Sequence, residues 1–405
     1  MNQNRKTSRV QFKTLIVLFL LLLSGSLKSQ AFQLTNQAEI SVITCSPGNE
    51  VYSVYGHSAI RVKDDVYKYD VAFNYGIFDF SAPNFLYRFA AGQTDYLLGA
   101  YQFDDFVQQY QRDKRSVYEQ TLNLTQNEKQ KIFDFLIWNA KPENRVYRYN
   151  FFFDNCATRV RDVVADNVEG GLTFKEEMQS HKTLRQLVDD YHGKLLWLTF
   201  GIDLAVSSES DREATFYEEM LLPDYLMNYF AEATKINGNI PLVQPTRIVY
   251  KAPAQEYKSF EAGSPFVVFF ILTLLVGFLS YKQFRKRKMK PGLDYIIYGM
   301  TGLTGIILSW LTLFSEHPAM SPNYNILWVL PLNLLFALAL IVKKWRPAIK
   351  YYHLFISAWL ILFICGSPFI PQYFHPAFYP IIVLVLCRSV LHSLLIMKMK
   401  VAGKS

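Results

Sequence analysis

The sequence contains no glycine-rich phosphate-binding loop, no spacing typical of zinc ligands and no tandem repeat. These absences argue against nucleotide-binding, zinc-binding and solenoid proteins, and we expect no cofactor and no metal. Cysteine is also scarce, with four in 405 residues. A framework of several disulfides is therefore excluded, and thiol chemistry has few candidate residues.

Long hydrophobic runs are absent from residues 31–263, but five follow Gly263. They cover residues 265–281, 293–314, 326–342, 351–371 and 376–396. Each approaches the roughly 20 residues that cross a bilayer, which predicts five transmembrane helices. The first 30 residues combine basic residues, an apolar core and small polar residues, as an export signal does; an uncleaved anchor is the alternative.

These patterns divide the chain into four parts. We expect a signal peptide at 1–30, an exported domain at 31–262, a five-helix transmembrane domain at 263–397 and a cytoplasmic tail at 398–405. Arg388 lies inside the last run, where we expect it to reach the cytoplasmic surface and to have no catalytic role.

Charge is distributed unevenly between these parts. Residues 282–290, residues 343–346 and the tail are rich in Lys and Arg, whereas the loops 315–325 and 367–375 contain neither. The positive-inside rule therefore places the exported domain and both neutral loops outside the cytoplasm. The net charge of +8 reflects this topology, because residues 31–263 are net acidic, and it gives no support for nucleic-acid binding.

Two of the four cysteines, Cys45 and Cys156, lie in the exported domain. Asp154 and Asn155, typical helix caps, precede Cys156, and apolar residues with helical spacing follow it. A thiol in the first turn of a helix lies near the positive end of the helix dipole, which favours the thiolate. A core position or a Cys45–Cys156 disulfide is the alternative.

Three strands are predicted before this helix, at residues 39–45, 52–62 and 67–75. Alternation along the second and third strands places His57 on a polar face that also carries Asp70 and Asn74. Either residue is a candidate neighbour of His57, because the sequence does not fix the register. A thiolate, a base and a group that orients the base are the parts of a cysteine nucleophile.

The remaining exported segments carry weaker signals. Aromatic residues are frequent in 81–120, where core packing is the leading explanation and a lipid-facing cleft the alternative. Thr125 and Glu128 form a capping box that predicts a helix through Trp138. Residues 170–260 are predicted to be mostly helical, with His192 in a structural role.

Several stretches resemble one known family. They are Tyr-Gly-His-Ser-Ala-Ile-Arg-Val (55–62), Phe-Asn-Tyr-Gly (73–76), Asn-Phe-Phe-Phe-Asp-Asn-Cys-Ala-Thr-Arg (150–159), Ser-Glu-His-Pro (315–318) and residues 325–333. They are similar to the lipoprotein N-acyltransferases of the Bacteroidota, the Lnb family. The order of a His strand before a Cys helix also resembles permuted papain-like folds, including lecithin:retinol acyltransferase and its NlpC/P60 relatives.

The resemblance implies an α+β, permuted papain-like exported domain followed by five transmembrane helices in the inner membrane, with the catalytic domain in the periplasm. It implies Cys156 as nucleophile and His57 as base; as the third member we favour Asp70 for its charge, with Asn74 as the alternative. Amides at the helix start are candidates for the oxyanion hole. Candidate substrate-binding residues are Asn155, Arg61, Arg159, Asn74, Tyr55 and His317.

The implied reaction moves an acyl chain from a phospholipid, through a Cys156 thioester, to the α-amine of a diacylglyceryl-cysteine lipoprotein. The expected partners are the phospholipid donor, the lipoprotein acceptor and the membrane, and no nucleic acid. Two alternatives remain at this point. One is a cell-wall cysteine peptidase or amidase, and the other is a non-catalytic membrane module with a Cys45–Cys156 disulfide.

Overall fold

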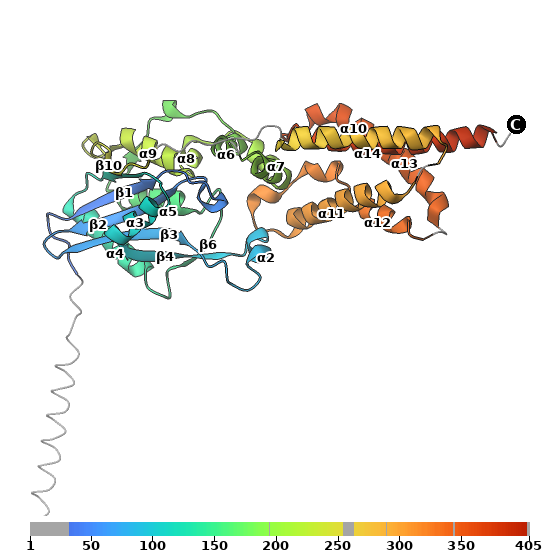
Figure 1. The fold of residues 1–405 in the computed structure, drawn as a ribbon. Coiled ribbons are helices and arrows are strands. Elements are labelled where there is room, and N and C mark those ends of the chain that lie inside the picture. Colours follow the sequence, from blue (N-terminus) through green and yellow to red (C-terminus); the bar gives the residue numbers. More distant parts are fainter. Residues whose placement is uncertain (1–31, 194, 254–262, 289, 343–344, 403–405) are drawn as a thin grey trace, which may run out of the picture.

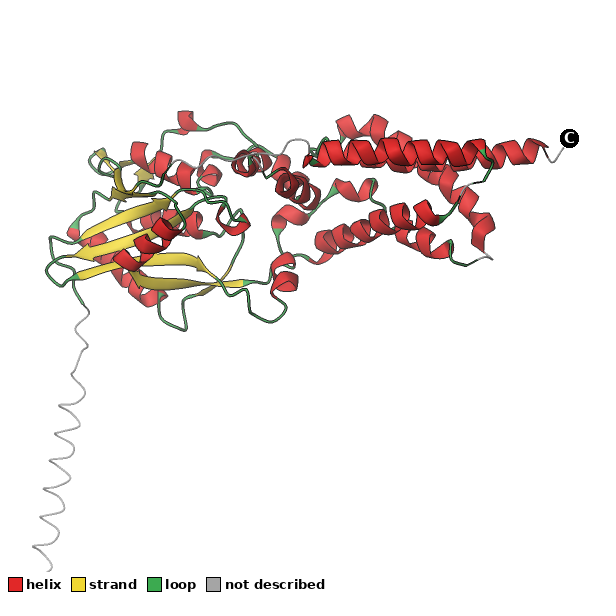
Figure 2. Ribbon diagram, viewed as in Figure 1, coloured by secondary structure: helices red, strands yellow, loops and turns green. Residues whose placement is uncertain are grey.

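The computed structural model describes residues 32–193, 195–253, 263–288, 290–342 and 345–402. The signal peptide predicted at 1–30 and the last three residues of the predicted tail lie outside the described residues. Figure 1 shows two regions joined end to end, a sheet with flanking helices and a bundle of long helices. All described strands belong to the first region (Figure 2). The predicted α+β domain followed by a helical unit is confirmed.

A seven-stranded antiparallel sheet forms the centre of the N-terminal region, with the strand order β10-β5-β1-β2-β3-β4-β6. Its strands are β1 (Glu39–Cys45), β2 (His57–Asp64), β3 (Tyr69–Ile77), β4 (Asp95–Gln102), β5 (Val117–Thr121), β6 (Val146–Arg148) and β10 (Arg247–Tyr250). The three strands predicted before Cys156 are β1, β2 and β3. β2 starts later than predicted, because a short 3-10 turn and Gly56, with a φ of +83°, precede His57.

Helices cover both faces of this sheet. The helices of this region are α2 (Phe85–Ala90), α3 (Phe103–Arg112), α4 (Gln126–Asn139), α5 (Cys156–Asn167), α6 (Leu184–His192), α7 (Leu196–Ala205), α8 (Phe216–Glu219) and α9 (Pro223–Glu232). A small second sheet contains β7 (Leu172–Thr173), β8 (Thr234–Lys235) and β9 (Ile240–Pro241). The capping box predicted at Thr125 and Glu128 does begin α4.

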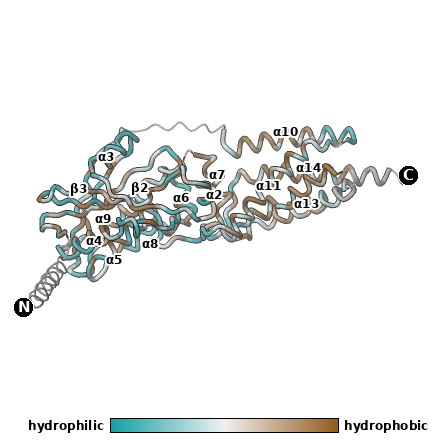
Figure 3. The backbone as a smooth tube through the Cα atoms, turned by 90° about the horizontal axis from the view of Figure 1, so that it is seen from below, coloured by the Kyte–Doolittle hydropathy of each residue, from teal (hydrophilic) through white to brown (hydrophobic). Residues whose placement is uncertain are grey.

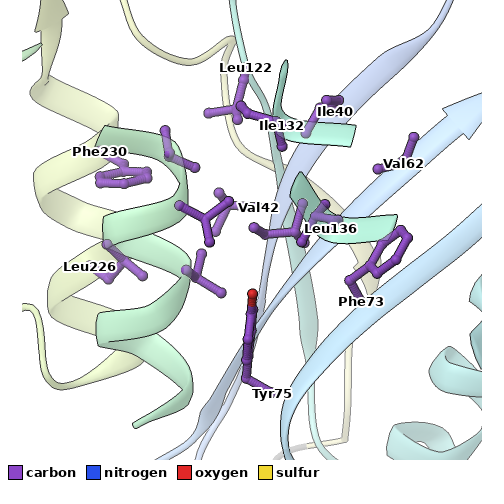
Figure 4. Packing of buried hydrophobic residues seen from close by; sticks show 14 of the residues in the cluster. Ile40, Val42, Val62, Phe73, Tyr75, Leu122, Ile132, Leu136, Leu226 and Phe230 are labelled. Atoms are coloured by element: carbon purple, nitrogen blue, oxygen red, sulfur yellow. The ribbon is translucent and has the colours of Figure 1, made fainter. Parts of the chain in front are cut away.

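Alternation along the strands decides which helices pack on which face. One face packs against α4, α5 and α9, and its core includes Ile40, Val42, Val62, Phe73, Ile132, Leu136, Leu226 and Phe230 (Figure 4). The opposite face, with Ile43, Cys45 and Ala59, packs against Phe103 and Phe106 of α3. Each large apolar side chain buried in this way stabilises the fold by roughly 1.5–3 kcal/mol. The two layers fix the position of α5 over β2 and β3.

In the part of the C-terminal region that the structure describes, four helices are long and apolar enough to cross a membrane. They are α10 (Pro265–Arg285), α11 (Gly292–Phe314), α13 (Arg346–Gly366) and α14 (Phe378–Ala402). Figure 3 shows that hydrophobic residues dominate this bundle.

The third predicted run, 326–342, is not a straight helix. Two helical segments, Pro318–Leu327 and α12 (Leu332–Ala339), follow one another here with a bend of 45° between their axes. Pro331 lies at the break, where it has no amide hydrogen to continue a helix. The five predicted crossings are therefore four long helices and one broken segment.

Two glycines allow α11 to approach the broken segment closely. A Cβ added at Gly302 would lie 2.0 Å from the amide nitrogen of Leu334, and one added at Gly305 would lie 1.8 Å from the carbonyl oxygen of Val329. Only the absence of a side chain permits this contact.

Arg388 does not extend to the cytoplasmic surface, and that prediction is wrong. Its side chain is fully buried and forms an ion pair with Asp294 of α11, with nitrogen–oxygen distances of 2.6 and 3.0 Å. It also donates to Ser280 and to the carbonyl of Lys290. The pair joins α14 to α11, since a buried charge is stable only with its partner.

We predict that Gly302→Ala destabilises the transmembrane unit, because the new methyl group overlaps backbone atoms of α12. Overpacking of this kind costs roughly 1–3 kcal/mol. The matched control is Gly299→Ala on the same helix, where nothing lies within 4 Å of the added Cβ. Thermal unfolding of the purified protein in detergent should show a lower midpoint for Gly302→Ala alone. Equal midpoints for the two variants would contradict the observed packing.

Candidate active site

Cys156 is the first residue of α5, and Asn155 caps the helix as predicted. The Asn155 side-chain oxygen accepts hydrogen bonds from the amides of Ala157 and Thr158 at 2.8 and 3.0 Å. Its side-chain nitrogen donates to the carbonyls of Phe151 and Leu221. All hydrogen-bonding groups of this buried amide are occupied by backbone atoms, which hold the loop and the start of α5 together around Cys156. A substrate contact of Asn155 stays a prediction.

His57 begins β2, directly below the start of α5. The sulfur of Cys156 interacts with the His57 ring and lies near the backbone amides of Ser58 and Ala157. Gly76 of β3 lies next to both residues. A Cβ added there would lie 3.7 Å from Cε1 of His57 and 3.8 Å from Cβ of Cys156. Strand and helix thus bring together two residues separated by 99 positions in the sequence.

Asn74, and not Asp70, is the neighbour of His57. The Nε2 atom of His57 donates to Oδ1 of Asn74 at 2.5 Å. The register pairs Ile60 with Phe73 and Lys63 with Asp70. Asp70 therefore lies opposite the part of β2 that is far from His57, two pleats along β3 from Asn74. Its carboxylate binds Arg61 instead. The prediction that Asp70 orients His57 is therefore corrected, and Asn74 takes that position.

The Asn74 hydrogen bond also fixes the tautomer of the ring. With the proton on Nε2, the Nδ1 atom of a neutral imidazole is an acceptor that can take the thiol proton. A carbonyl oxygen holds the ring without adding a negative charge. This is the geometry required of a general base next to a nucleophile.

The two pKa values of the pair shift toward the charged forms. Burial opposes the shift of Cys156, but attraction to His57 and hydrogen bonds from the ring and from the amides of Ser58 and Ala157 lower the thiol pKa below its usual value. Burial likewise opposes the shift of His57, but the charge of Cys156 and hydrogen bonds to Cys156 and Asn74 raise its pKa. The geometry favours a thiolate–imidazolium pair.

Cys45 has a different environment, although it lies opposite His57 in the β1–β2 register. It is fully buried under α3, and burial raises its pKa to about 12. Cys45 and Cys156 are both free thiols in the structure. Of these two, only Cys156 combines access to a base with a lowered pKa.

The two arginines among the predicted substrate-binding residues are engaged in ion pairs. Arg61 is buried, donates to Asp70 and Glu119 at 2.6–2.9 Å and lies 3.7 Å from the ring centroid of Phe103. It is on the α3 face of the sheet. The side chain of Arg159 binds the Asp154 carboxylate with two nitrogens and covers the ring of Tyr147. Substrate binding by either arginine stays a prediction.

Tyr55 belongs to a second polar group that the sequence did not reveal. Its hydroxyl lies 2.6 Å from Nε2 of His192, and Nδ1 of His192 lies 3.4 Å from Oδ1 of Asp189. The ring of Tyr55 packs at 4.6 Å against Phe151, in the loop before Cys156. No spacing in the sequence relates residues 55 and 192, so only the fold could reveal this contact.

His317 lies at the junction of the two regions and not beside Cys156. Its Nε2 donates to the carbonyl of Phe89 at 2.9 Å, and the neighbouring Glu316 binds Arg148 at 2.8 Å. The prediction of a substrate-binding role is thus replaced by a link between the neutral loop and α2. No group of three or more His, Cys, Asp or Glu in the part of the chain that the structure describes could hold a metal ion.

The lowered pKa of Cys156 can be tested by alkylation. We expect iodoacetamide to label Cys156 well below the pH range of an ordinary thiol, because the thiolate persists until the pH falls below its lowered pKa. In His57→Ala the imidazolium no longer counteracts the effect of burial, so the pKa of the Cys156 thiol should rise. The rate of alkylation at pH 7 should then fall about tenfold or more. Mass spectrometry of the Cys156 peptide gives the rates.

Two variants separate the candidates for the third position. Asn74→Ala frees the ring and should reduce labelling at pH 7, whereas Asp70→Asn, which contacts Arg61, should leave the pH profile unchanged. A shift with Asp70→Asn and none with Asn74→Ala would contradict the observed hydrogen bonds.

Comparisons with known proteins identify both regions. Residues 29–190 match the family model of the Lnb N-terminal periplasmic domain, and residues 255–400 match that of the Lnb transmembrane domain. No curated protein and no solved structure matches the chain. The two family models cover most of the sequence in the expected order and indicate a membrane protein that modifies lipoproteins. The chain, with its periplasmic N-terminal domain and its transmembrane helices, belongs to the Lnb family.

Proposed function

We propose that this protein is a lipoprotein N-acyltransferase of the inner membrane with Cys156 as its nucleophile, His57 as its acid–base group and Asn74 as the residue that orients His57. The donor is a phospholipid and the acceptor is the α-amine of a diacylglyceryl-cysteine lipoprotein. The observation that carries the proposal is the Cys156–His57–Asn74 arrangement in a periplasmic domain joined directly to transmembrane helices. A cysteine nucleophile suits a reaction in which an acyl group must be held between two substrates.

In the first step the Cys156 thiolate attacks the carbonyl carbon of a phospholipid ester. The backbone amide of Ser58, which lies near the sulfur in the resting site, is the candidate donor to the developing oxyanion, since the Ala157 amide already donates to Asn155. One such donor is worth about 3 kcal/mol of transition-state stabilisation. The imidazolium of His57 then protonates the departing alkoxide, which releases lysophospholipid and leaves an acyl thioester on Cys156.

In the second step the neutral α-amine of the lipoprotein attacks the thioester. His57, now neutral, removes a proton from the nitrogen as the C–N bond forms. The C–S bond breaks, the amide is released and the thiolate–imidazolium pair is restored. The two steps balance without a metal, an oxidant or a nucleotide.

The attachment to a membrane contributes to the rate. Both substrates are anchored by acyl chains in the same leaflet, so each reaches a domain fixed at the bilayer surface by lateral diffusion within the membrane. Holding them in one orientation replaces encounters in solution by a reaction within a complex, an effect worth up to about 7–11 kcal/mol in well-oriented systems.

Incubation with phospholipid and a synthetic diacylated lipopeptide, followed by mass spectrometry, tests the proposal. Wild-type protein should produce a lipopeptide with a third acyl chain, and it should pass through an acyl adduct on Cys156. Cys156→Ala and His57→Ala should remove the product while the protein still accumulates, with a loss of at least about a thousandfold.

Asn74→Ala should lower the rate by about ten- to a hundredfold, since the ring loses its orientation. Asp70→Asn serves as the comparison. Any loss of its activity should be no larger than its loss of folded protein. Cleavage of a peptidoglycan fragment by wild-type protein, with no acylated lipopeptide, would replace the acyltransferase by a cell-wall peptidase. A native Cys45–Cys156 disulfide would rule out both enzymes.

A further inference from the structure

Helix α2 exposes an apolar surface that the protein itself does not cover. None of its six residues is buried, although four of them are Phe85, Leu86, Tyr87 and Phe89. The side chain of Leu86 is 80% exposed, that of Tyr87 59%, and that of the nearby Phe80 61%. Single exposed apolar residues are common, but a contiguous group of this kind marks a binding surface.

The position of α2 relative to the membrane is fixed by the outer end of α11. Ser315 donates to the carbonyl of Ala90 at 2.8 Å, and the amide of Glu316 donates to that of Ala91 at 2.9 Å. Gly92 lies so close to the 316–317 backbone that a Cβ there would approach the amide nitrogen of His317 to 2.9 Å. Figure 1 shows α2 beside this end of the bundle. The helix is held rigidly at the membrane boundary.

The exposed apolar surface continues from α11 onto α2. Leu313 and Phe314, in the last turn of α11, are exposed in the same way as the residues of α2. The ring of Tyr87 packs against Trp310 with 5.2 Å between centroids. Tyr and Trp are the residues typical of the bilayer interface, where their polar atoms meet the headgroups.

Charged groups of this junction are paired with one another. Arg88 donates to the carbonyl of Gln93 and to Asp95, and Arg148 bridges Asp95 and Glu316 at 2.8–2.9 Å. Paired charges beside exposed apolar side chains are the pattern of a segment that lies in a membrane interface.

Beside α2 lies a shallow, open groove of about 570 Å³, lined by Phe80, Ala82, Asn84, Phe85, Leu86 and Tyr87. A row of aromatic rings leads inward from it, with centroid distances of 5.8 Å for Phe85–Phe78, 4.9 Å for Phe78–Tyr96 and 4.1 Å for Tyr96–Tyr149. Tyr149 packs on the same core as Cys156.

We propose that α2 and Phe80 lie in the leaflet that faces the periplasm and that their groove binds an acyl chain of a membrane phospholipid. The aromatic row then guides this chain from the bilayer toward Cys156. The lipid contact stands on the geometry of α2 and α11 alone, whereas the guiding role rests on the proposed acyltransferase function.

Photo-crosslinking tests the lipid contact without any need for activity. The Cys156→Ala variant, reconstituted in nanodiscs with a phospholipid that carries a diazirine on one acyl chain, is irradiated and its peptides are mapped by mass spectrometry. We expect adducts on residues 80–90 as well as on the transmembrane helices. The substitution Leu86→Glu should reduce the adducts on 80–90 at least about tenfold, because a carboxylate is unfavourable at that depth, and leave those on α10 unchanged.

The matched control is Ile137→Glu on α4, which replaces an exposed apolar residue of the periplasmic domain. Its adduct pattern should equal that of the parent. Labelled transmembrane helices with no adduct on 80–90 would overturn the lipid contact.

The guiding role is tested in the Cys156-containing protein. Leu86→Glu should lower acylation of the lipopeptide about tenfold or more while iodoacetamide labels Cys156 at the unaltered rate. Unchanged acylation in Leu86→Glu would overturn this role even if α2 touches lipid. If wild-type protein forms no acylated product, the proposed function fails, and the crosslinking result still decides whether α2 lies in the membrane.

Discussion

The amide side chain of Asn155 is the contact on which the site depends. It binds two amides of the first turn of α5, a carbonyl of the aromatic loop before it and a carbonyl of residue 221. A single buried group thus joins helix, loop and a distant segment, and leaves no donor or acceptor unpaired. An unsatisfied buried partner would cost about 1–3 kcal/mol, so the start of α5 has one stable position. That position places the sulfur of Cys156 over the first residue of β2, which is His57.

The layered arrangement explains why the nucleophile and the base come from opposite sides of the sheet. α5 packs on the face that contains Ile60 and Val62, whereas the His57 side chain belongs to the face covered by α3. They meet because the start of α5 lies over the start of β2. Gly76 of β3 lies in contact with both residues, and its φ of +97° is a backbone conformation that favours glycine.

Local patterns predicted much of this arrangement, and long-range geometry supplied the rest. The alternation of residues 57–62 and 69–75 assigned the correct faces, and the Asp-Asn pair before Cys156 marked the true start of a helix. The register of the hairpin was not encoded locally, so charge was a poor guide to the choice between Asp70 and Asn74. The Glu119 partner of Arg61 is likewise distant in the sequence, whereas Arg159 pairs with Asp154, only five residues before it. Hydropathy identified the third membrane run but not its break at Pro331. Mean hydropathy reports how apolar the side chains are and does not depend on whether the backbone hydrogen bonds of a helix continue.

The ion pair between Asp294 and Arg388 has a consequence for how the protein is made. The aspartate lies on α11 and the arginine on α14, and a ribosome synthesises them 94 residues apart. Until α14 enters the bilayer, α11 holds an acidic group without its counter-ion, and such a group is expensive in hydrocarbon. The packing of α11 is therefore complete only once the last helix of the chain is in place, because α14 supplies the counter-ion of Asp294.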